Sequence, residues 1–80
     1  MAGRWRAAMT PLTITSMMAG RLSPADAGSL VAFYDHGRRC GRLVSIWWRE
    51  GGDIELLLAS GEKHIVSVSS EVDVIREETA

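Results

Sequence analysis

Aromatic and cationic side chains gather around one predicted turn and the strand that follows it. The cluster consists of Tyr34, Arg38, Arg39, Arg42, Trp47 and Trp48. Arginines on a turn can hold phosphates while an outward indole stacks on a base, which is the chemistry of a nucleic-acid site. Tryptophan, tyrosine and arginine are also the residue types that anchor protein-binding hot spots. If these residues have only a structural role, the arginines are solvated and the indoles lie in the core. We take these six residues as the candidate partner-binding site.

The tryptophan doublet carries the strongest functional inference in the sequence. Trp47 and Trp48 are adjacent in a predicted strand, so their side chains point to opposite faces. Both indoles therefore cannot lie in one core. One of them must be covered by the N-terminal residues, be covered by a partner, or remain exposed.

Four side chains have the chemistry to hold a metal ion: Asp35, His36, Cys40 and His64. They share a site only if the strand with His64 lies beside the turn at residues 36–39. Their spacing is not that of a zinc module. We therefore expect a turn histidine, a strand histidine and a small buried thiol, with no metal bound.

Enzymatic chemistry has little support in this chain. A cysteine nucleophile needs a nearby base, and the only local candidate for Cys40 is His36, across a tight turn. No pair of carboxylates has a reason to lie on either side of a substrate. A chain of 80 residues also has little interior in which to build a pocket. We therefore expect that the chain is not an enzyme, has no catalytic residue, and binds neither a cofactor nor a small-molecule substrate.

Five short β segments, each bounded by turn residues, must position these side chains. They cover residues 29–35, 40–50, 53–60, 63–68 and 72–76. A short helical turn precedes them, with Ser23 as its N-cap and Pro24 at its first position. The second segment contains two apolar doublets, which predicts a long strand that is either buried on both faces or bent by a bulge.

The two ends of the chain differ from the segment between them. Residues 1–22 contain arginine, serine and threonine but no acid, and they lack a clear signal-peptidase site. We expect them to form a flexible arm with one extended stretch at residues 12–16, and we expect residues 77–80 to fray. The predicted organisation is thus a single domain at residues 23–76 between an arm and a tail.

Length and composition limit the classes of protein that remain. The chain has 80 residues, 46% of them hydrophobic and 24% charged, with a mean hydropathy of +0.03. It has no run of about 18 apolar residues, so no membrane-spanning helix is expected. One cysteine excludes an internal disulfide and is typical of a cytoplasmic protein. A core this thin favours stabilisation by self-association or by a bound partner.

The charges are unevenly divided along the sequence. Residues 1–42 have a net charge of +4 and residues 43–80 a net charge of −5, although the whole chain has only −1. The near-neutral total is not typical of a nucleic-acid-binding protein. If the division persisted in the folded molecule, the two halves would present faces of opposite sign.

Four short patterns resemble the SH3-like small barrels, a broad class that includes Tudor and KOW-type modules. The patterns are Gly28-x-x-Val31-x-Phe33, Gly41-x-Leu43-x-Ser45-x-Trp47, Ile54-x-Leu56-x-Leu58 and Ser70-Glu71-Val72. The arrangement over residues 22–76 is especially similar to short barrel proteins of actinobacterial bacteriophages. The resemblance implies a mostly β, five-stranded SH3-like barrel in a bacterial host cytoplasm, and it brings no catalytic residues. The domain also lacks a full aromatic cage for methylated lysine.

These observations lead to two hypotheses of different classes. In the first, the chain is a non-enzymatic barrel that binds a protein partner or associates with itself. In the alternative, it is a nucleic-acid-binding barrel that uses the Arg38, Arg39 and Arg42 turn. We rank the first higher because eight acidic residues in the second half oppose a polyanion.

Overall fold

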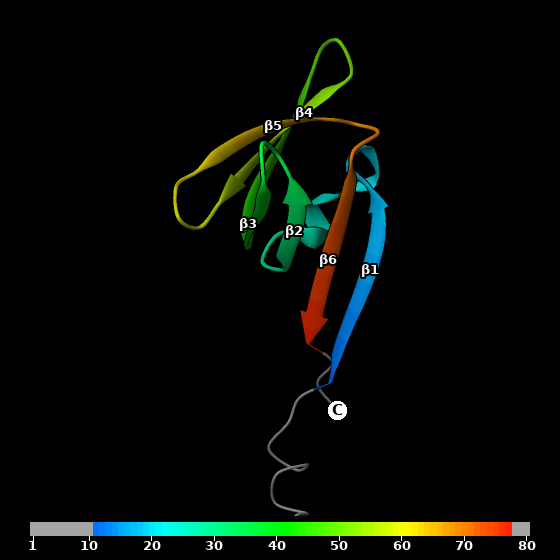
Figure 1. The fold of residues 1–80 in the computed structure, drawn as a ribbon, viewed down its shortest axis with the longest axis vertical. Coiled ribbons are helices and arrows are strands. Elements are labelled where there is room, and N and C mark those ends of the chain that lie inside the picture. Colours follow the sequence, from blue (N-terminus) through cyan, green and yellow to red (C-terminus); the bar gives the residue numbers. More distant parts are fainter. Residues whose placement is uncertain (1–10, 78–80) are drawn as a thin grey trace, which may run out of the picture.

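Strands dominate the computed structural model, which describes residues 11–77. The strands are β1 (Leu12–Met18), β2 (Leu30–Tyr34), β3 (Arg38–Arg49), β4 (Asp53–Leu58), β5 (Lys63–Ser67) and β6 (Glu71–Glu77). Two short 3-10 helices, η1 (Ala19–Arg21) and η2 (Pro24–Asp26), lie between β1 and β2. The strands form one antiparallel sheet in the order β1-β6-β2-β3-β4-β5 (Figure 1). The mostly β class that the sequence indicates is confirmed.

Period-two alternation explains the strands of the second half. In β4, Ile54, Leu56 and Leu58 are buried, whereas the residues between them are half-buried or exposed. A strand with this alternation places its apolar side chains on one face of the sheet. The turn before β4 needs backbone angles that favour glycine, and Gly51 and Gly52 supply them with φ of +87° and +83°.

Strand β3 is long because it belongs to both halves of the sheet. Its first part pairs with β2 and its second part pairs with β4, with a register shift between Leu43 and Ser45. Such a bulge bends a strand, which confirms the bent-strand interpretation for the Leu43-Val44 doublet, whereas Trp47 and Trp48 lie in regular register beyond it. Gly41 lies just before the bend, where a Cβ would meet the Leu58 Cδ1 at 3.1 Å.

The bend folds the sheet over a single apolar core. The buried cluster comprises Ala19, Leu22, Val31, Phe33, Leu43, Ile54, Leu56, Leu58, Val66, Val72 and Val74. The 3-10 helix η2 packs beside β3. It is the helical turn that the sequence predicts, with Ser23 as its N-cap. The Asp26 carboxylate accepts a hydrogen bond from the Ser23 N–H at 2.8 Å and also meets the Arg76 guanidinium.

The sheet differs from the predicted barrel in its strand count and its closure. It has six strands rather than five, and β1 and β5 remain at separate edges, so the sheet is not closed. Residues 12–18 of the predicted flexible arm form β1 and pair with β6 along their whole length. Strand β6 runs to Glu77, one residue into the predicted tail.

The sixth strand has a physical cause that the sequence does not show. The β1–β6 pairing joins segments more than 50 residues apart, so no local pattern in residues 12–18 reveals the partner that makes them a strand. Residues 1–10 of the predicted arm and residues 78–80 of the predicted tail lie outside the described residues.

Candidate interaction surfaces

The two adjacent tryptophans lie on opposite faces of β3, and both are exposed. The side chain of Trp47 is 65% exposed and that of Trp48 is 54% exposed. Trp47 is opposite Glu55, and Trp48 is opposite the buried Ile54. Because opposite residues of two paired strands share a face, Trp48 points to the core side and Trp47 to the outer side. The described part of the chain therefore buries neither indole.

Trp48 forms one wall of a small apolar pocket between η2 and β3. The pocket has a volume of about 230 Å³ and is lined by Pro24, Ala27, Val44, Ser45, Ile46 and Trp48. The bulge places Val44 at its edge, and the 3-10 helix supplies Pro24. Sites for small molecules usually measure about 300–1,000 Å³, so this pocket better suits one apolar side chain of a protein partner.

Trp47 belongs to a flatter surface on the outer side of β3, β4 and β5. Its row across the sheet continues through Glu55 to the exposed Ile65. Arg49 forms an ion pair with Glu55 at 3.3 Å and flanks the indole. An apolar centre with a charged rim is typical of a protein contact.

The arginines of the predicted site do not form one cluster with the tryptophans. Arg38 lies opposite Tyr34 at the start of β3. Arg39 turns back onto its own hairpin, where its Nε donates to the Asp35 carbonyl oxygen at 2.9 Å. Arg42 donates to the Gly28 carbonyl oxygen at the other end of the β2–β3 pair. The bulge of β3 lies between Arg38 and Trp47, which pair with different strands, β2 and β4.

Acidic side chains lie beside the exposed Tyr34 and Arg38. The two residues border a hollow of about 270 Å³, which Glu71 and Asp73 of β6 also line. The sheet order places β6 next to β2, which brings these carboxylates close to the cationic end of the hairpin. Their charge opposes a phosphate at this position.

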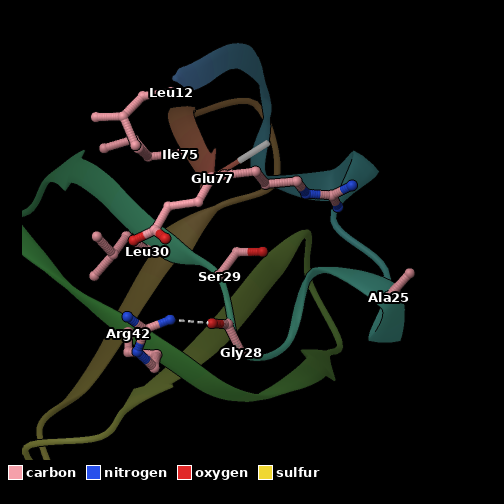
Figure 2. Close-up of a pocket in the computed structure, with 9 residues that line it drawn as sticks. Leu12, Ala25, Gly28, Ser29, Leu30, Arg42, Ile75 and Glu77 are labelled. Carbon is pink, nitrogen blue, oxygen red and sulfur yellow. Dashed lines mark hydrogen bonds between the residues drawn. The ribbon is translucent and has the colours of Figure 1, made fainter. Parts of the chain in front are cut away.

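A third hollow lies where β1 begins and β6 ends. It has a volume of about 520 Å³, with Leu12, Leu30 and Ile75 providing apolar surface (Figure 2). Arg42 and Glu77 also line it, and the Arg42 guanidinium is held by the Gly28 carbonyl oxygen (Figure 2). The hollow therefore mixes charges of both signs with apolar surface and does not indicate one ligand chemistry.

A buried histidine joins two carboxylates, an arrangement that the sequence does not reveal. The His64 Nδ1 lies 2.9 Å from the Asp35 Oδ2, and its Nε2 lies 3.0 Å from the Glu62 Oε2. The ring also makes an edge-to-face contact with Phe33 at 5.2 Å. The hydrogen bonds with Asp35 and then Glu62 raise the pKa of His64, against the opposing effect of burial.

The possible metal ligands meet only in part. Strand β5 does bring His64 beside the β2–β3 turn, as a shared site requires, but carboxylates occupy both ring nitrogens. Cys40, predicted as a buried thiol, is exposed on β3. It lies opposite Ala32, on the face of the sheet away from the core. Among residues 11–77, no group of three or more His, Cys, Asp or Glu side chains is arranged to hold a metal ion.

The fold and these surfaces describe a small, mostly β chain whose exposed features are apolar sheet faces and shallow hollows. A scan against models of known protein families, a search of curated proteins and a search of solved structures each return no match. Within residues 11–77, no helix has the length and apolar character needed to cross a membrane. A functional proposal must therefore rest on the geometry of the chain itself.

Proposed function

We propose that this chain is a non-enzymatic, SH3-like interaction module that binds a protein partner through the Trp48 pocket. The observation that carries the proposal is an indole that walls an apolar cavity and is still 54% exposed. Tryptophan is among the residue types enriched in hot spots, and hot spots cluster in pockets that lose their water when the partner binds. The resemblance to phage barrels adds the cytoplasm of a bacterial host as the proposed setting.

The strand arrangement supports the SH3-like part of the proposal. Strands β2 to β6 follow the order β6-β2-β3-β4-β5, and one long bent strand is shared between the two halves. This is the arrangement expected of a small barrel whose sheet folds over on itself. Strand β1 would then be an addition beside β6.

Peptide selection provides a test that needs no known partner. A displayed library of random peptides is selected against the immobilised chain, and the affinities of enriched peptides are measured by isothermal titration calorimetry, whose signal does not depend on either tryptophan. We expect peptides with an apolar anchor residue, and we expect Trp48→Ser to weaken them by roughly 30-fold, the effect of a hot-spot residue.

Trp47→Ser is the matched control because the same residue type is removed from the neighbouring position on the opposite face. Both side chains are exposed, so both variants should keep their fold. The proposal is wrong if no peptide is enriched, or if Trp48→Ser binds the selected peptides as well as the wild type.

Nucleic-acid binding remains the second candidate because the exposed Tyr34 lies opposite Arg38. An aromatic ring beside a guanidinium can stack a base and hold its phosphate. We rank it lower because Glu71 and Asp73 line the same hollow. It requires oligonucleotide binding that weakens steeply with salt and is lost in Arg38→Ala, which leaves the hairpin bonds of Arg39 in place. Absence of binding at low salt would remove this candidate.

A further inference from the structure

Strand β1 is an edge strand without the usual protection against pairing. The sheet order leaves β1 and β5 at the two edges, and no other strand among residues 11–77 pairs with the far side of β1. Strand β5 has only five residues and carries Lys63. Strand β1 has seven residues, Leu-Thr-Ile-Thr-Ser-Met-Met, none of them charged. Natural edge strands are usually shortened or charged, so β1 resembles a strand that receives a partner.

The backbone of β1 presents its free hydrogen-bonding groups at regular positions. Beyond the end of β1, the Ala19 N–H donates to the Ser70 carbonyl oxygen at 2.7 Å, in continuation of the β1–β6 register. Hydrogen-bonded pairs alternate along an antiparallel ladder, so the odd-numbered residues of β1 bond to β6. The backbone groups of Leu12, Ile14, Ser16 and Met18 therefore point to the free edge.

Most side chains of β1 are exposed, and Met17 is the residue of this strand that packs against the core. The first five residues of β1 are exposed, so both faces of this part of the strand are open. Leu12 is 60% exposed, Ile14 is 62% exposed and Met18 is 49% exposed. Strand β1 lies along β6 at the edge of the sheet (Figure 1).

We propose that β1 pairs antiparallel with β1 of a second copy of this chain, about a two-fold axis at Thr15. The edge available for pairing begins at Leu12, the first residue of β1, and ends at Met18, after which η1 leaves the sheet. Full overlap of the seven residues then places Thr15 opposite Thr15 of the second copy. The pairing extends beyond the proposed function because it uses the edge formed by β1, whereas the Trp48 pocket lies between η2 and β3.

The self-pairing is complementary in its side chains. In this register Leu12 lies opposite Met18 of the second copy, and Ile14 lies opposite Ser16. Four such pairs of even-numbered residues would exchange about eight backbone hydrogen bonds. On the outer face, Ile14, Ile75 and Leu30 form an apolar row across β1, β6 and β2. This row would extend up to the contact between the two β1 strands.

The charges near the junction are too far apart to oppose the pairing. Glu77 lies opposite Leu12, and Glu71 lies opposite Met18, both on β6. Glu77 of one copy and Glu71 of the other would be three strand spacings apart, about 14 Å. The Debye length at physiological ionic strength is about 8 Å, so their repulsion is largely screened.

Charged substitutions at Thr15 in the full chain test both the pairing of the two β1 strands and the position of the two-fold axis. The mass in solution is measured by light scattering over roughly a hundredfold range of concentration, at low and high salt. We expect the wild type to approach twice 8.7 kDa in both salts. Thr15→Lys and Thr15→Glu should each be monomeric, because like charges meet at the axis. An equimolar mixture of the two variants should recover the dimer.

Ser67→Lys is the matched control, since it adds the same charge to an exposed position at the opposite edge of the sheet. It should leave the dimer intact.

As a second measurement, amide hydrogen exchange at Leu12, Ile14, Ser16 and Met18 should slow as protein concentration rises, whereas exchange at the odd-numbered residues of β1 should not change. A wild type that is monomeric throughout, or a dimer that survives Thr15→Lys, overturns the proposal. Neither result bears on peptide binding at Trp48, so the two proposals fail separately.

Discussion

At the scale of single residues, His64 should make the stability of the protein depend on pH. Only the protonated ring donates a hydrogen bond to both Asp35 and Glu62, and these bonds raise its pKa in the folded state. Its stabilising effect is therefore complete below pH 6.5, the pKa in the unfolded chain, and is lost as pH rises through the higher folded-state pKa.

Urea unfolding between about pH 5.5 and pH 8.5 measures this effect. The midpoint of the wild type should fall as pH rises, and His64→Gln should remove that fall. His36→Gln is the control because the side chain of His36 is 94% exposed and its contact with Asp35, at 3.7 Å, is screened by solvent, so most of the fall should remain in this variant. An unchanged profile in His64→Gln would show that this histidine does not couple protonation to folding.

The tryptophans and His64 show what can be predicted at this scale. The opposite directions of Trp47 and Trp48 follow from the two-residue period of a strand, so the sequence alone predicts that one core cannot hold both. The His64–Asp35 contact joins residues 29 positions apart. It depends on how β5 lies against the β2–β3 turn, which no local pattern contains. The same holds for Arg39 and Arg42, whose backbone partners separate them from the indoles.

At the scale of elements, η2 depends on one buried carboxylate. Asp26 is buried, accepts the Ser23 N–H at 2.8 Å and contacts the Arg76 guanidinium of β6. Asp26→Ala removes the cap of η2 and leaves both donors without this acceptor, so we expect a loss of about 1–3 kcal/mol in the free energy of unfolding. The Ser23 hydroxyl lies 3.5 Å from the same carboxylate, so Ser23→Ala should cost less. Equal losses in urea unfolding would contradict this account of η2.

Gly41, just before the bend of β3, packs closely against Leu58. A Cβ there would lie 3.1 Å from the Leu58 Cδ1, so Gly41→Val should destabilise the protein by about 1–3 kcal/mol through overpacking. Leu58→Ala alone should cost about 2–5 kcal/mol by leaving a cavity. In the double variant the added methyl groups occupy part of that cavity, so the combined loss in urea unfolding should be smaller than the sum. Additive losses would show that the two residues do not compete for space.

The elements also differ in how far the sequence predicts them. Alternation in β4 and the glycine turn before it are local features, and both are found in the structure. The apolar doublets predict a bend in β3, and the bulge lies at Val44. Strand β1 is different because its partner β6 lies at the other end of the chain. The threonines of β1 and its alternating apolar and polar residues are compatible with a strand, but they form one only because β6 pairs with them.

At the scale of the whole molecule, folding mixes the two oppositely charged halves of the sequence. Strand β6, with Glu71 and Asp73, lies between β1 and β2 and so places late acidic residues beside the earlier Arg38. The sheet order, which the sequence does not reveal, thus removes the division that the linear charges suggest. A surface of mixed sign suits a protein partner better than a polyanion.

Self-pairing through β1 should also make thermal stability depend on protein concentration. A small chain buries a limited fraction of its surface, so a second copy that binds only the folded state adds stability by mass action. A hundredfold rise in concentration is worth about 1.4 kcal/mol per chain, which corresponds to an increase of about 5–10 °C in Tm for a domain of this size. Calorimetry should show this rise for the wild type and Ser67→Lys but not for Thr15→Lys. A Tm that is independent of concentration in all three would mean that the β1 edge adds nothing to the stability of the folded chain.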